Sequence, residues 1–214
     1  KKSERFYVTK TDIPDGLTEN DLEQFPGLKT CVPFLDTLLH GYLYTLPEDV
    51  YVNTMGEDVK IYTIYPDGTK TEGSDFIKSR GHESGALIPR PEGHMDQHMI
   101  WSNTLGFKTP RGYSTLLTHP LNRYDLPFTT LSGIIDSDKW NNPGNIPFFI
   151  RKNLDMVIPK GTPICSLIPI KRNNWTHVEG GKYLEAKMTK DGSDVRTVKS
   201  GWYRDHFWVK KEFN

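Results

Sequence analysis

The 214-residue sequence has few cysteines, no long apolar run and no excess of charge of either sign. Its two cysteines, Cys31 and Cys165, match no metal or redox spacing and are too few for a disulfide framework, which favours a reducing compartment. Cys165 lies in the apolar segment 163–168, so we expect a buried thiol. No apolar run approaches the roughly 20 residues of a membrane-spanning helix, and none follows the basic start as in a signal peptide. We therefore expect no membrane partner. The expected location is the cytoplasm, and the cytoplasm of a host cell or a virion is the alternative.

The balance of charge limits the partners that composition alone can suggest. Lysine and arginine together number 27, as do aspartate and glutamate, so the formal net charge is zero. Such a chain has no global field that would attract nucleic acid or an anionic membrane, although a local basic patch is compatible with this balance.

Turn formers and aromatic residues are abundant: there are 18 Gly, 15 Pro, 10 Tyr, 10 Phe and 5 Trp. This composition is typical of short strands joined by tight turns, and predicts a mainly β fold. One helix is expected over Thr30–His40, because Thr30 can cap it, Gly41 can end it, and its apolar residues share one face. Residues 72–96 are expected to be a long loop, of the kind that is often functional or mobile. The expected strands are Phe6–Val8, Tyr42–Leu46, Val50–Asn53, Val59–Tyr65, one from Thr69 onward, Met99–Trp101, Tyr113–Thr118, Phe128–Ile135, Ile146–Arg151, Met156–Ile158 and Ile164–Ile170.

These elements predict one structural domain with three portions. Residues 1–98 form an N-terminal α+β portion. Residues 99–172 form a β-barrel core, because closely spaced strands favour a barrel or a sandwich. Residues 173–214 form a C-terminal arm with a weak helix at Tyr183–Met188.

Two segments carry most of the functional information. Residues 133–138 read Gly-Ile-Ile-Asp-Ser-Asp, and residues 158–168 read Ile-Pro-Lys-Gly-Thr-Pro-Ile-Cys-Ser-Leu-Ile. Upstream, residues 110–113 read Pro-Arg-Gly-Tyr. Together, over about residues 106–172, they resemble motifs of the trimeric dUTPase and dCTP-deaminase superfamily, in which an aspartate hairpin and a later glycine-containing strand belong to one small barrel.

The resemblance implies a distorted dUTPase-like (β-clip) barrel, a homotrimer with pockets between subunits, and a nucleotide ligand. By position, Asp136 would be the catalytic residue that orients the water attacking the nucleotide, with Mg²⁺ if hydrolysis is retained. Gly133, Asp138, Arg111, Trp140 and Tyr113 would contribute to ligand binding, the last two by stacking on the base. Independently of the resemblance, a carboxylate at a strand end can be partly desolvated, which suits activation of water.

Several motifs of that superfamily are changed here. Its stacking tyrosine is replaced by Lys139-Trp140, its Arg-Ser-Ser motif by residues 118–124, and a glutamine of its fourth motif by Ser166. Its first motif and its glycine-rich fifth motif have no counterpart. Asp136 and Asp138 could then simply cap a turn. The alternative hypothesis is a non-catalytic oligomeric or phage-associated structural protein. Residues 31–42 also resemble an uncharacterised family of tailed phages and marine bacteria, which implies no activity.

A third hypothesis concerns metal binding. His94, Asp96 and His98 alternate and would share a face if they formed a strand, as in the His-x-Asp pair of metal-dependent oxygenases. His119, His177 or His206 could supply a further ligand. The alternative interpretation is loop or surface histidines without a metal.

The aromatic and basic end of the chain, residues 202–211, has two interpretations. Its rings could stack on bases between basic contacts. If it is helical, Tyr203 and Phe207 are four residues apart, and such a pair typically docks on the core or on another subunit.

Overall fold

The computed structural model describes residues 32–102, 106–140, 144–173 and 202–210. Residues 41–172 belong to one compact unit, and residues 32–40 and 202–210 belong to a second. The strand expected at Phe6–Val8 and the helix expected at Tyr183–Met188 lie outside the described residues, as does Cys31.

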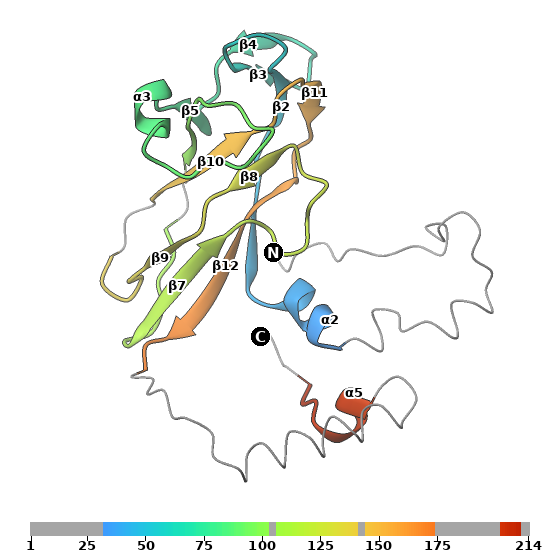
Figure 1. The fold of residues 1–214 in the computed structure, drawn as a ribbon, viewed down its shortest axis with the longest axis vertical. Coiled ribbons are helices and arrows are strands. Elements are labelled where there is room, and N and C mark those ends of the chain that lie inside the picture. Colours follow the sequence, from blue (N-terminus) through green and yellow to red (C-terminus); the bar gives the residue numbers. More distant parts are fainter. Residues whose placement is uncertain (1–31, 103–105, 141–143, 174–201, 211–214) are drawn as a thin grey trace, which may run out of the picture. The chain divides into compact units, whose positions relative to one another are not determined.

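The first unit is built from three four-stranded antiparallel sheets, as expected for a mainly β protein (Figure 1). The first sheet has the order β1-β12-β7-β9, the second β5-β6-β10-β8 and the third β11-β2-β3-β4; each order is linear, so none of the three closes on itself over the described residues. The strands of the first sheet are β1 (Tyr42–Thr45), β12 (Pro163–Lys171), β7 (Tyr113–Thr118) and β9 (Gly133–Ile135). Those of the second are β5 (Ile77–Ser79), β6 (Met99–Ser102), β10 (Asn145–Ile150) and β8 (Phe128–Thr130). Those of the third are β11 (Asp155–Ile158), β2 (Asp49–Asn53), β3 (Lys60–Ile64) and β4 (Lys70–Glu72).

The expected strands within the described residues are confirmed, with one exception. Residues 128–135 were expected to form one strand, which was wrong: β8 pairs with β10 in the second sheet, whereas β9 pairs with β7 in the first. The chain changes sheets at Leu131-Ser132, where the Leu131 amide still donates to Pro147 O at 2.8 Å. Ser132 and Gly133 stand at this change, and a Ser-Gly pair is a turn signal, although it does not indicate that the flanking strands join different sheets.

The expected long loop over residues 72–96 is also corrected. It contains the strand β5 and a short helix, α3 (His82–Gly85). Both are shorter than the windows over which periodicity can be recognised.

Strands from before and after residue 98 pair with each other in all three sheets. β1 pairs with β12, β2 with β11 and β5 with β6. The close approach of β1 to β12 explains one glycine: a Cβ at Gly41, whose φ is +73°, would lie 2.4 Å from Leu167 O.

Aromatic residues dominate the buried core of this unit. Trp101 stacks on Phe148 with ring centroids 3.7 Å apart, and meets the edge of Phe128 at 4.9 Å. Its indole nitrogen donates to Thr130 Oγ1 at 3.0 Å, and that hydroxyl donates to Ile164 O at 2.6 Å, so the core also links the second sheet to the first. Cys165 is buried as expected, and burial raises the pKa of its thiol to about 12.

The second unit contains α2 (Val32–Leu39) and α5 (Trp202–His206). α2 confirms the expected helix, with Pro33 in its first turn. Trp208 donates its indole N–H to Asp36 Oδ2 at 3.0 Å, and the rings of Tyr203 and Phe207 stack at 6.5 Å. Among the described helices, none is long and apolar enough to cross a membrane.

Candidate functional site

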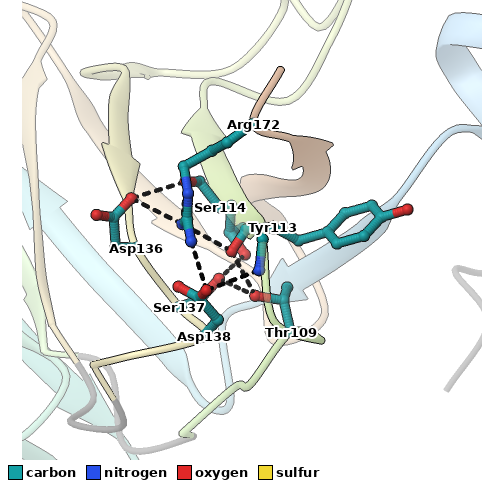
Figure 2. Close-up of polar contacts among 9 residues, drawn as sticks. Thr109, Tyr113, Ser114, Asp136, Ser137, Asp138 and Arg172 are labelled. Atoms are coloured by element: carbon teal, nitrogen blue, oxygen red, sulfur yellow. Dashed lines mark hydrogen bonds and ion pairs between the residues drawn. The ribbon is translucent and has the colours of Figure 1, made fainter. Parts of the chain in front are cut away.

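The Asp-Ser-Asp segment at residues 136–138 follows the edge strand β9 and turns back immediately. The amides of Lys139 and Trp140 both donate to Asp136 O at 2.9 Å. The carboxylates of Asp136 and Asp138 instead bond to groups from β7, from Arg172 just after β12, and from the turn before β7, so they do more than close their own turn (Figure 2).

Asp138 is the buried member of the pair, with its side chain 3% exposed. Its Oδ2 accepts a hydrogen bond from the Gly112 amide at 2.9 Å and another from the Arg172 guanidinium. The Arg172 hydrogen bond, followed by the Gly112 amide, lowers the pKa of Asp138 to about 2. Asp138 is therefore an ionised acceptor at neutral pH, and it joins the end of β12 to the turn before β7.

Asp136 lies beside these contacts of Asp138 but faces solvent, with its side chain 53% exposed. Its Oδ1 accepts from Ser114 Oγ at 2.8 Å and from Arg172 Nη1 at 3.0 Å. Arg172 Nη1 also donates to Ser114 Oγ at 2.9 Å, so the three groups form a closed triangle (Figure 2). The other carboxylate oxygen, Oδ2, makes no hydrogen bond with any residue that the structure describes, and it can accept one from a water or a ligand.

Ser137, which lies between the two aspartates in the sequence, anchors residues 136–138 through its side chain. Its side chain is fully buried, and its hydroxyl lies 2.8 Å from Thr109 Oγ1 and 2.7 Å from Thr115 Oγ1. Thr109 Oγ1 in turn donates to Tyr113 O at 2.9 Å. This hydroxyl chain holds the turn before β7 and the turn after β9 in one arrangement.

A hollow of about 640 Å³ opens where these two turns meet. It is lined by Lys108, Thr109, Pro110, Arg111, Gly112, Asp138, Lys139 and Arg172. Most of this lining is polar or charged, and it contains no aromatic side chain.

The predicted binding residues are brought together only in part. Arg111 and Asp138 line the hollow. Gly133 is exposed, and a Cβ there would meet no heavy atom within 4 Å, so no neighbouring strand requires a glycine. Trp140 is 56% exposed, and the ring of Tyr113 points away from the carboxylates in Figure 2. The ring of Tyr113 therefore does not lie over Asp136.

The predicted metal ligands do not converge. Residues 94–98 form no continuous strand: His94 makes only an isolated bridge with Arg151, and residues 96–97 form a bend. His94 and His98 are buried, whereas Asp96 is exposed, so the three side chains do not share a face as expected. The ring of His94 is already engaged, with Nδ1 2.9 Å from Glu92 O and Nε2 3.0 Å from Thr129 Oγ1. Asp96 lies 3.2 Å from His82 Nδ1.

The further candidate ligands do not complete such a site. His119 bonds through both nitrogens, to Arg123 O and the Thr130 amide, and His177 lies outside the described residues. Over the described part of the chain, no group of three or more His, Cys, Asp or Glu side chains could hold a metal ion.

Three residues of the cluster were missed by sequence reasoning. Ser114 and Ser137 lie on apolar strands or next to them, where serine carries no signal. Arg172 lies in a polar stretch with Lys171, and no motif singles it out. The only signal for it is its place directly after β12, whose last residue, Lys171, pairs with Tyr113 at the start of β7.

Together, the fold and this cluster define a mainly β protein of antiparallel sheets, with an ordered group of carboxylates, hydroxyls and an arginine at one end of the first sheet. No family model matches the chain, and no curated protein matches it.

Proposed function

We propose that this chain binds a nucleotide beside Asp136 and hydrolyses a phosphate bond in it, in the manner of dUTPase-like proteins. The observation that carries the proposal is the state of Asp136, which is fixed through Oδ1 by Ser114 and Arg172 while its side chain remains half exposed. A carboxylate that is oriented on one side and open on the other is suited to positioning a water for attack on phosphorus.

The placement of the two informative segments also supports the proposal. β9, which precedes Asp136, and β12, which contains residues 163–168, lie in the same sheet with β7 between them. A dUTPase-like barrel is accordingly the arrangement that we propose for the strands of the first unit.

In this proposal, Mg²⁺ would arrive with the phosphates. The described residues offer no cluster of three or more metal ligands, and Mg²⁺ in phosphate chemistry is commonly held by one or two carboxylates together with the substrate. When bound, the ion would neutralise charge on the phosphates; Asp136 would orient the water, and Arg172 would keep Asp136 in position.

The test is a panel of pyrimidine and purine nucleotides, each with Mg²⁺, in thermal-shift and phosphate-release measurements. We expect at least one nucleotide to raise the Tm and to be hydrolysed. Asp136→Asn should retain the shift and lose at least about tenfold in rate, because general-base catalysis contributes roughly 10²–10⁴-fold. Asp75→Asn, which changes an exposed carboxylate outside the cluster, is the matched control. Flat shifts with every nucleotide would end the proposal.

A second candidate is a non-catalytic oligomer, favoured by the open edge of the first sheet. β9 is an edge strand, and Ile134 in its middle is 64% exposed. Exposed edges that carry apolar side chains are sites of pairing with other chains. Light scattering distinguishes the cases: a trimer that Ile134→Lys converts to a monomer, in a protein that binds no nucleotide, would favour the structural role.

A further inference from the structure

The lining of the hollow beside Asp138 carries four cationic side chains and one carboxylate. Lys108, Arg111 and Lys139 all line it, and none makes an ion pair with a residue in the described part of the chain. The remaining cation, Arg172, is paired with Asp136 and Asp138. In a chain with no net charge, three unpaired cations around one hollow form a local positive field.

The backbone that carries these cations is held in place. Lys108 and Arg111 enclose the Thr109-Pro110 pair, and the Thr109 amide donates to Ser137 O at 3.3 Å. Lys139 follows Asp138, which accepts a hydrogen bond from the Gly112 amide at 2.9 Å. The two turns are therefore tied to each other, and a ligand need not bring them together.

We infer that this hollow binds a chain of phosphates, with Lys108, Arg111 and Lys139 as its ligands. Three separated cations match several neighbouring phosphate groups better than one carboxylate, since arginine can bind phosphate oxygens in a bidentate manner and lysine acts as a point charge. A hollow of about 640 Å³ exceeds the needs of a single phosphate. Its lining lacks an aromatic ring, so it recognises phosphates and not a base.

This inference rests on the proposed function only in identifying the source of the phosphates. If Asp136 acts on a nucleotide, the hollow takes that nucleotide's phosphate chain. The same chemistry would also take a free inorganic polyphosphate, and the two sources are separated below.

The experiment is isothermal titration of the full chain with inorganic triphosphate and, separately, with a nucleoside triphosphate, at low ionic strength. The test variant combines Lys108→Gln, Arg111→Gln and Lys139→Gln. All three positions are exposed, so folding should be unaffected. The control combines Lys60→Gln, Lys78→Gln and Lys160→Gln, which removes the same charge from exposed positions outside the hollow.

We expect the parent chain to bind inorganic triphosphate, the test variant to lose at least about tenfold in affinity, and the control to change little, because charge-assisted contacts are local. Binding should weaken as salt is added. Tighter binding of the nucleoside triphosphate than of triphosphate would identify a nucleotide as the source, and equal binding would identify a free polyphosphate.

Absence of triphosphate binding, or an equal loss in both variants, overturns the inference. Nucleotide hydrolysis that persists at full rate in the test variant overturns it while leaving the proposed function intact. Triphosphate binding without any nucleotide hydrolysis overturns the proposed function alone.

Discussion

The aromatic core of the second sheet and the polar cluster at the end of the first sheet are stabilised in opposite ways. Around Trp101, rings stack and meet edge to face, and a large apolar area is removed from water. Around Arg172, a few short hydrogen bonds join charged groups, one of which, Asp138, is buried while another, Asp136, faces solvent.

This difference separates the source of stability from the site of chemistry. Burial of apolar area is non-directional, so it stabilises the fold without selecting a ligand. Charged groups at a partly exposed sheet end are held in defined orientations but remain able to act on a ligand. We therefore expect the loss of an apolar ring from the core to change stability most, and the loss of a carboxylate from the cluster to change the pH dependence of stability.

The largest effect should come from Phe148→Ala. Phe148 is fully buried and stacks on Trp101, so we expect a loss of about 3–5 kcal/mol in the free energy of unfolding. Urea denaturation measures it. Tyr65→Ala, at a position 47% exposed, is the control and should cost much less. A loss below about 1 kcal/mol for Phe148→Ala would show that this stack is not central to the core.

A smaller and pH-dependent effect is expected for Asp138→Asn. The Arg172 hydrogen bond, then the Gly112 amide, lower the pKa of Asp138 to about 2, below the roughly 3.9 of an unfolded aspartate. The folded state therefore gains stability from the ionised form above about pH 4, and loses it as the pH falls toward 2. Asp138→Asn should have a lower Tm than the parent at pH 7, and the difference should shrink as the pH falls from 4.

Asp136→Asn is the matched variant for that measurement, because Asp136 shares the Arg172 contact but is half exposed. Its Tm should change less than that of Asp138→Asn at pH 7. If the difference in Tm between the parent and Asp138→Asn stays constant from pH 7 to pH 3, the ionised Asp138 does not stabilise the fold through Arg172 and Gly112.

Most strands can be predicted from local sequence, but the way in which they join into sheets cannot. The bounds of β7 agree with the prediction, because its apolar and polar residues and the turn at residues 110–112 mark it. The change of sheet between β8 and β9 is not predictable, because the Ser132-Gly133 pair indicates a turn but not which sheet each flanking strand joins. Strand existence is a local property, whereas sheet membership is decided by packing.

The candidate site divides in the same manner. Asp136 and Asp138 could be selected because two carboxylates follow an apolar strand at a turn. The difference between the buried Asp138 and the exposed Asp136 could not be predicted. It depends on Arg172, more than 30 residues away, and on the backbone amide of Gly112. The metal hypothesis placed His94 and Asp96 on one face because it assumed a strand over residues 94–98, where the chain instead bends.

The smallest effect, and the one of opposite sign, should come from His98→Leu in the core. His98 is 8% exposed, lies 5.8 Å from the ring of Phe149, and has no hydrogen-bond partner for either ring nitrogen among the described residues. Burial, and then the charge of Arg80, lower its pKa below 6.5. The unfolded state therefore takes up a proton first as the pH falls, so stability is full above about pH 6.5 and declines below it.

Leucine of similar size at position 98 removes two unsatisfied polar atoms and this titration together. We expect the free energy of unfolding to be unchanged or raised by up to about 1 kcal/mol at pH 7.5, and the advantage to grow toward pH 5.5. His94→Leu is the contrasting control, because both nitrogens of His94 are bonded, to Glu92 O and Thr129 Oγ1, and their loss should destabilise the protein at both pH values. If His98→Leu instead destabilises the chain as much as His94→Leu does, the ring of His98 has a polar partner. The core around Phe149 would then depend on a polar contact as well as on apolar packing.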